Sequence, residues 1–254
     1  MTDEARNILV VAHGRRPDTV GAAARVIGAL RDAGATPVLS SDDRAELDSA
    51  IPGPLATLGA DVAVADIELA IVLGGDGTIL RAAELVREGS APVLGINMGH
   101  VGFLAEIERD DMDEAVRRVI DRDYTVEERL ALQVRIKDRD EQVIYETWAL
   151  NEATVEKASR ERMLEVVIEI DGRPLSSFGC DGIVVSTPTG STAYNFSAGG
   201  PVIWPGVEAI AVVRHHGLQS SLTAATNPNP DRHVEKVGTH LVVTGSRAAT
   251  PNRS

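Results

Sequence analysis

Short apolar runs alternate with amphipathic segments through the first 123 residues. The runs have the length of buried parallel strands, and the segments between them place apolar residues at helical spacing. We expect strands at 7–12, 36–39, 69–73 and 92–97. We expect helices at 19–33, from the glycine-rich segment after residue 73 through residue 86, and at 112–122. Strands that alternate with helices predict an α/β domain over residues 1–123, with a parallel sheet covered on both faces.

From about Tyr124 the pattern changes to strands, with no convincing long helix between them. The strand-like segments are rich in Val and Ile, and Asp171-Gly172 between two of them is a strong turn signal. They cover residues 131–137, 142–150, 164–170 and 183–186. We therefore expect a second, mainly antiparallel β domain over residues 124–213.

Residues 214–254 differ again in composition. They hold five of the Lys and Arg residues, only two acidic residues and four of the six His residues. The prolines of Asn227–Pro230 exclude regular secondary structure there, and only His240–Thr244 has the pattern of a strand. We expect an atypical tail over this range.

Composition narrows the function. The 254 residues are 43% apolar, as in a globular protein, and the 3% of aromatic residues makes base stacking unexpected. The net charge of -13 argues against nucleic-acid and anionic-membrane partners. No apolar run approaches the roughly 18 residues of a membrane span, and the acidic start does not resemble a signal peptide. The single cysteine, Cys180, excludes an internal disulfide. We expect a cytoplasmic protein.

The most informative segment is Gly74–Thr78 (GGDGT), between an expected strand and an expected helix. Its glycines let the backbone approach a ligand closely, and the following helix offers its N-terminus to an anion. The Asp76 carboxylate would repel a phosphate unless it holds a metal or accepts a proton, which indicates phosphoryl transfer. Arg81 lies one helical turn further on. A tight structural turn and a solvated helix face are the alternative interpretations.

Four other segments carry polar groups that suit a nucleotide. The loop Asn97–Leu104 follows a strand, and the amide and carboxylate of Asn151-Glu152 suit the hydroxyls of a ribose. The segment Cys180–Pro201 has many small hydroxyl residues and glycines that could wrap a dinucleotide. His13–Arg16 could meet phosphate oxygens through its arginines. Taken singly, each also fits a structural loop, a surface turn or a linker, although Ala193–Phe196 is too apolar for a linker.

Together these segments resemble the NAD kinase family, in its bacterial branch. The matching pieces are LGGDGT at 73–78, NMGHVGFL at 97–104, NE at 151–152, CDGIVVSTPTGSTAY at 180–194 and SAGGP at 197–201. The GGDG pattern alone is shared with lipid kinases and phosphofructokinases, whereas TPTGSTAY is far more specific. The resemblance extends from residue 7 to about residue 213.

The resemblance implies a Rossmann-like α/β domain followed by a β-rich, sandwich-like domain, with the site between them. It implies transfer of the ATP γ-phosphoryl group to the 2′-hydroxyl of the adenosine ribose of NAD, with Asp76 as the general base. Mg²⁺ or another divalent cation would come with ATP, and a homodimer or homotetramer is implied. The implied positions that bind nucleotide are Gly74, Gly75, Gly77, Thr78, Arg81, Asn97, Asn151, Glu152, Asp181, Thr192, Ala193, Tyr194, Asn195 and Ser197.

Beyond Val213 the resemblance stops, and the further strands of the family are not recognisable. We hypothesise that residues 214–254 are translated out of frame or disordered, which would leave the β domain incomplete with exposed sheet edges. A divergent C-terminus is the alternative. Two other functions stay open from the sequence, a truncated, non-catalytic remnant of an NAD kinase and a GGDG-type kinase of a lipid or sugar.

Overall fold

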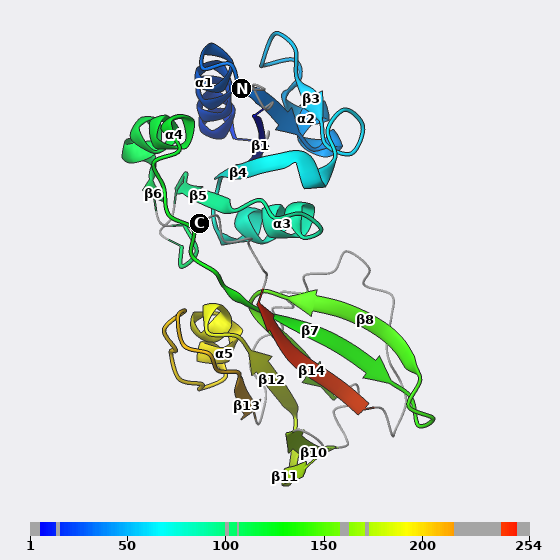
Figure 1. Ribbon diagram of the computed structural model, residues 1–254. Coiled ribbons are helices and arrows are strands. Elements are labelled where there is room, and N and C mark those ends of the chain that lie inside the picture. Colours follow the sequence, from blue (N-terminus) through cyan, green and yellow to red (C-terminus); the bar gives the residue numbers. More distant parts are fainter. Residues whose placement is uncertain are drawn as a thin grey trace. The chain divides into compact units, whose positions relative to one another are not determined.

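Two units of different architecture make up the chain (Figure 1). The computed structural model describes residues 6–13, 16–99, 102–105, 107–157, 163–170, 173–215 and 240–247. The boundary between the units falls between Glu127 and Glu128, close to the predicted change at Tyr124. Among the described residues, no helix has the length and apolar character that crossing a membrane requires.

The first unit is built on a parallel sheet. Its described strands are β1 (Asn7–Ala12), β2 (Thr36–Leu39), β3 (Ala56–Thr57), β4 (Ile67–Leu73), β5 (Val93–Asn97) and β6 (Ile107–Glu108). They lie in the order β3-β2-β1-β4-β5-β6, and each neighbouring pair is parallel. The four longer strands confirm the prediction. The two-residue edge strands β3 and β6 were not predicted, because two residues show no periodicity.

Helices cover both faces of this sheet. They are α1 (Pro17–Asp32), α2 (Ser41–Leu47), α3 (Asp76–Val86) and α4 (Met112–Asp121), with short 3-10 turns at Val64–Asp66 and Arg109–Asp111. Ile8 and Val10 face one side, in one hydrophobic cluster with residues of α1 and α4, whereas Leu9 and Val11 share the other cluster with residues of α3. Strands buried on both faces explain the continuous apolar runs in the sequence.

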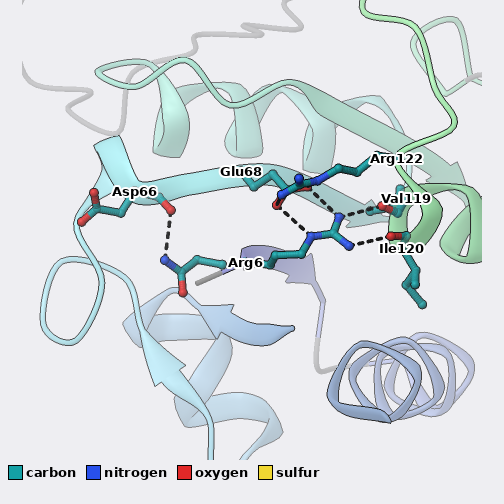
Figure 2. Close-up of polar contacts among 7 residues, drawn as sticks. Arg6, Asp66, Glu68, Val119, Ile120 and Arg122 are labelled. Atoms are coloured by element: carbon teal, nitrogen blue, oxygen red, sulfur yellow. Dashed lines mark hydrogen bonds and ion pairs between the residues drawn. The ribbon is translucent and has the colours of Figure 1, made fainter. Parts of the chain in front are cut away.

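A group of charged side chains ties the amino ends of β1 and β4 to the end of α4 (Figure 2). Arg6 donates to the Glu68 carboxylate at 2.6 and 2.9 Å and to the carbonyl oxygens of Val119 and Ile120 at 2.8 and 2.6 Å. Arg122, in the left-handed conformation that ends α4, donates to the same carboxylate at 3.1 Å. Arg6 thereby satisfies carbonyl groups that a helix end leaves without intrahelical partners.

The second unit is antiparallel in every strand pair that the structure describes. Its described strands are β7 (Leu130–Lys137), β8 (Val143–Ala149), β9 (Glu152–Glu156), β10 (Leu164–Ile170), β11 (Arg173–Cys180), β12 (Gly182–Ser186), β13 (Ala211–His215) and β14 (His240–Arg247). They form three sheets, with the orders β13-β12-β9, β14-β7-β8 and β10-β11. Cys180, Ile183 and Leu132 belong to a hydrophobic core shared by residues of all three sheets.

This unit confirms the predicted β-rich architecture and adds strands that the pattern did not indicate. Both β9 and β11 carry many polar residues and were not predicted, and the expected Asp171-Gly172 turn lies outside the described residues. Strand β14 pairs with β7 from His240 to Arg247, which is longer than the predicted 240–244. Residues 216–239 and 248–254 of the expected tail lie outside the described residues, so the hypothesis about its origin stays a prediction.

Candidate active site

The GGDGT loop lies where the order of the strands reverses. In open α/β sheets, ligands bind beyond the carboxyl ends of the strands at the point where the order reverses, and here that point is between β1 and β4. Gly74 leaves β4, donating its N–H to the Ile96 carbonyl at 3.0 Å, and Asp76 is the first residue of α3. A Cβ at Gly74 would lie 2.5 Å from Thr78 Oγ1, so the tight turn requires glycine there, whereas a Cβ at Gly75 or Gly77 would meet none of the described residues within 4 Å.

The Asp76 carboxylate is held by the second predicted loop. Oδ2 accepts the Phe103 N–H at 3.1 Å, and Oδ1 accepts the Leu104 N–H at 3.0 Å. The structure thus brings Asp76 into contact with residues that follow it by 27 and 28 positions in the sequence. Asn97, at the end of β5, is buried and donates to Glu108 at 3.2 Å while it accepts the Gly99 N–H at 3.1 Å. Asn97 thus links the start of the loop, at Gly99, to Glu108 of β6.

Arg81 has a partner that the sequence analysis missed. Its Nη1 lies 2.8 Å from Oδ1 of Asp43 on α2, and its Nη2 donates to the Ala12 carbonyl at 3.4 Å. Burial raises the pKa of Asp43 above its usual range, against the opposing effect of Arg81. The sequence marks Asp43 only as an acidic residue in the first turn of α2. Its backbone N–H donates to the hydroxyl of Ser40, the N-cap residue, at 3.1 Å.

A cavity of about 390 Å³ adjoins this ion pair. Its lining comes from the end of β1, from α2 and from α3, and it is formed by His13, Asp42, Asp43, Ala45, Glu46 and Arg81. Asp43 Oδ2 and Arg81 Nε are buried and have no hydrogen-bond partner among the described residues. The cavity is lined by side chains of both charges.

In the second unit, the TPTGS turn packs against Asn151. The Thr187 N–H donates to the Asn151 carbonyl at 2.9 Å, and the Thr187 hydroxyl bonds the Leu150 carbonyl at 2.6 Å and accepts the Gly190 N–H at 3.0 Å. A Cβ at Gly190 would lie 2.6 Å from Asn151 Cα and closer still to its carbonyl. Asn151 lies directly before β9, and Glu152 is the first residue of that strand.

Among the described residues of this unit, three polar atoms are buried and have no hydrogen-bond partner. They are Asn151 Oδ1, Glu152 Oε2 and Asn195 Oδ1. Because buried polar groups nearly always have partners, these atoms are candidates for pairing with a water molecule or a ligand group. Burial raises the pKa of Glu152 to about 7, although a hydrogen bond from the Tyr194 backbone opposes the shift. Glu152 therefore exists in both protonation states near neutral pH.

The other predicted positions of the second unit lie mostly in and around the short helix α5. Asn195, fully buried, donates to the carbonyls of Ser191 and Pro201 at 3.2 and 3.1 Å. The Tyr194 hydroxyl lies 3.2 Å from Glu156 Oε1, and Asp181 forms an ion pair with Lys157. Thr192 and Ala193 are half-buried, and Ser197 is exposed at the end of the short helix α5 (Tyr194–Ser197). Each unit thus holds one group of the predicted residues.

A parallel sheet with an acidic glycine loop where its strand order reverses, followed by an antiparallel β-rich unit, defines an α/β protein of the class that takes its ligand at the carboxyl ends of the strands. Residues 18–124 match the ATP-NAD kinase N-terminal domain, and residues 150–247 match the ATP-NAD kinase C-terminal domain. The NAD kinase of Leifsonia xyli subsp. xyli is 63% identical over 210 residues, which cover 82% of this chain and 69% of that protein. NAD kinase 2 of Streptomyces coelicolor is 50% identical over 214 residues, covering 83% and 70%. This chain belongs to the ATP-NAD kinase family.

Solved structures agree with this assignment. Yeast NADH kinase complexed with NADH aligns with a TM-score of 0.74 and 26% identity, covering 87% of this chain and 69% of that chain. An NAD kinase from Archaeoglobus fulgidus in complex with ATP aligns with a TM-score of 0.63 over 95% of this chain and 90% of that chain. At 23% identity, the second likeness concerns the fold alone.

Proposed function

We propose that this chain transfers the γ-phosphoryl group of ATP to the 2′-hydroxyl of the adenosine ribose of NAD, which yields NADP and ADP. Membership of the ATP-NAD kinase family supports the reaction. The assignment of the base rests on the position of Asp76, the first residue of α3, beside the point where the strand order reverses. The N–H groups of Phe103 and Leu104 fix its carboxylate.

Asp76 is the general base in this proposal. Each of its oxygens accepts one N–H, which leaves lone pairs for a substrate hydroxyl. The 2′-hydroxyl gives its proton to the carboxylate as its oxygen bonds to the γ-phosphorus, and the bond to the β,γ-bridging oxygen breaks to release ADP. Phosphoryl transfer depends mainly on positioning and on charge stabilisation, so a fixed carboxylate is what the reaction needs.

The glycine loop and the start of α3 would serve the phosphates. Gly75 and Gly77 leave open space, and the N-terminus of the 11-residue helix α3 favours negative charge. Mg²⁺ or another divalent cation would be held chiefly by the phosphate oxygens of ATP, as is usual for this ion. Arg81, held by Asp43, would add a positive charge at the same end of the sheet.

The second unit would bind the dinucleotide. Asn151 Oδ1, Glu152 Oε2 and Asn195 Oδ1 are buried acceptors without partners among the described residues, and hydroxyl or amide groups of NAD would satisfy them. Thr192, Ala193, Tyr194, Ser197 and Asp181 complete the proposed binding positions. Exposed apolar side chains of the same unit, such as Trp204 at 83% and Val202 at 60%, support the further proposal of a homodimer or homotetramer.

An NADP-specific coupled assay tests the reaction. The purified chain, given NAD and Mg-ATP, is expected to form NADP, and ³¹P NMR of the product is expected to show the new phosphate on the 2′-oxygen. Binding of NAD without NADP formation would favour a non-catalytic remnant instead. Phosphorylation of a lipid or sugar hydroxyl in place of NAD would favour the other kinase classes.

A further inference from the structure

The space that the Asp76 carboxylate occupies exists because residue 102 has no side chain. A Cβ built on Gly102 would lie 3.0 Å from Asp76 Cγ and closer still to Oδ1. Gly102 is not among the glycines with positive φ, so the backbone conformation does not require glycine there. The requirement comes from the close approach of the carboxylate to the backbone of the loop.

The next two residues hold the carboxylate in a fixed plane. Successive backbone N–H groups, from Phe103 and Leu104, each donate to a different oxygen of Asp76. Two bonds of this kind restrict rotation about both side-chain torsions of an aspartate, whereas a single bond would leave the carboxylate free to turn. A carboxylate held in this way meets the requirement that a reacting group be oriented before the substrate arrives.

The loop itself is anchored to the sheet. Leu104 and Ala105 pack against the hydrophobic cluster that contains Ile79 of α3. A Cβ at Gly95, in β5, would lie 2.5 Å from Ile79 Cδ1 and 3.3 Å from Ala105 Cα, so strand, helix and loop meet closely. The two N–H donors therefore have a position set by the core, even though the Phe103 side chain itself is 75% exposed.

We propose that Gly102, Phe103 and Leu104 are positioning residues for catalysis, with the two amides orienting the Asp76 carboxylate and Gly102 providing the space for it. This inference rests on the proposed role of Asp76 as the base. The side chains of Phe103 and Leu104 are not required for this role, because the donors are backbone groups. The steric requirement at residue 102 is the part that a substitution can test.

The test compares Gly102→Ala with Gly21→Ala, the same change at an exposed position of α1 outside the candidate site. Apart from the backbone of its own helix, a Cβ at Gly21 would meet no atom of the described residues within 4 Å. We expect Gly102→Ala to lower kcat by about 10- to 100-fold, in line with the effect of displacing a reacting group by about 1 Å. The KM for NAD is expected to stay within about threefold, because binding in the ground state does not depend on the orientation of the base. Gly21→Ala should leave both constants within about threefold of the wild type.

A double-mutant cycle separates positioning from a general structural effect. In the Asp76→Asn background, the Gly102→Ala change is expected to cause little further loss of kcat, because residues that act as a unit are not additive. Unchanged kcat in Gly102→Ala, or the same fold loss in both backgrounds, would overturn the proposal. If Asp76→Asn itself keeps the wild-type kcat, the proposed function of Asp76 fails, which is a different outcome.

Amide hydrogen exchange covers the case in which Gly102→Ala does not fold. In Asp76→Ala, the amides of Phe103 and Leu104 lose their acceptor and are expected to exchange about tenfold faster or more than in the wild type, while amides of β4 keep their protection. Equal exchange rates at both residues in the two proteins would contradict the contact on which the proposal depends.

Discussion

The Arg81 guanidinium on α3 and the Asp43 carboxylate on α2 form an ion pair of 2.8 Å, and the aspartate side chain is 3% exposed. Arg81 is a nucleotide-binding position implied by the resemblance, whereas Asp43 was not among the predicted positions. The pair shows that Arg81 is held at the carboxyl end of the sheet by a buried acid, so changes at Asp43 should be felt at Arg81.

We predict that Asp43→Ala lowers the free energy of unfolding by about 1–3 kcal/mol, because it leaves a partly buried guanidinium without its partner. The loss is less than for a fully buried pair, since Arg81 is 34% exposed. The KM for ATP should rise as well. Asp42→Asn, at the exposed neighbouring position, is the matched control and should change stability little. Urea unfolding at pH 7 measures both, and equal midpoints for the two variants would contradict the prediction.

The ion pairs of the Glu68 carboxylate should make the free energy of unfolding depend on pH in the acidic range. Burial alone would raise the pKa of Glu68, but hydrogen bonds from Arg6 and Arg122 outweigh it and lower the pKa from 4.5 to about 2 (Figure 2). A lowered pKa stabilises the folded state above pH 4.5, and this stability is lost as the pH falls toward 2. Glu68→Gln should therefore cost about 2–3 kcal/mol at pH 7 and clearly less at pH 3.

Unfolding curves at the two pH values check this prediction. Glu114→Gln removes a carboxylate that pairs with Arg117 and Arg118 on an exposed helix face, and it should have little effect at either pH. A loss for Glu68→Gln that is the same at pH 7 and pH 3 would show that the ion pairs do not contribute.

Glu152 predicts the opposite dependence on pH. Its pKa is raised by burial from 4.5 to about 7, so the folded state binds the proton more tightly than the unfolded state. Stability contributed by the protonated form is present below pH 4.5 and falls as the pH rises from 4.5 to about 7. Glu152→Gln should be more stable than the wild type at pH 8, by about 1–3 kcal/mol, and nearly equal at pH 5. Thermal unfolding at the two pH values would refute this if the variant gained nothing at pH 8.

Gly190 links the TPTGS turn to the proposed dinucleotide site. A Cβ there would overlap the Asn151 backbone, so Gly190→Ala should displace the start of β9 and raise the KM for NAD about tenfold or more. Gly206→Ala serves as the control, because a Cβ at that residue would meet none of the described residues within 4 Å and its φ is not positive. Equal KM values for NAD in both variants would show that the close packing is not needed for binding.

Much of the first unit could be predicted from the sequence because its strands are buried on both faces. The runs 7–12 and 69–73 carry so many apolar residues that strand, turn and helix could be placed, and with them Asp76 at the carboxyl end of the sheet. The β-rich character of the second unit followed from its Val and Ile content. By contrast, β11 contains Ser176 and Ser177 on an exposed strand, where no alternation of apolar and polar residues marks the fold.

What the sequence could not provide are contacts between distant residues. Asp43 sits among charged neighbours in a seven-residue helix, where an aspartate is normally solvated, and its burial depends on how α2 packs. Arg6 and Glu68 are 62 residues apart, and their pairing follows from the parallel register of β1 and β4. The role of Gly102 depends on the position of Asp76 at the start of α3.

The most direct test of the central claim measures NAD binding and NADP formation side by side for the wild type and Asp76→Asn. We predict that the wild type forms NADP from NAD and Mg-ATP, whereas the variant binds NAD with similar affinity and forms NADP about 10²- to 10⁴-fold more slowly, the usual contribution of a general base. A variant as active as the wild type, or a wild type that binds NAD and forms no NADP, would contradict the account.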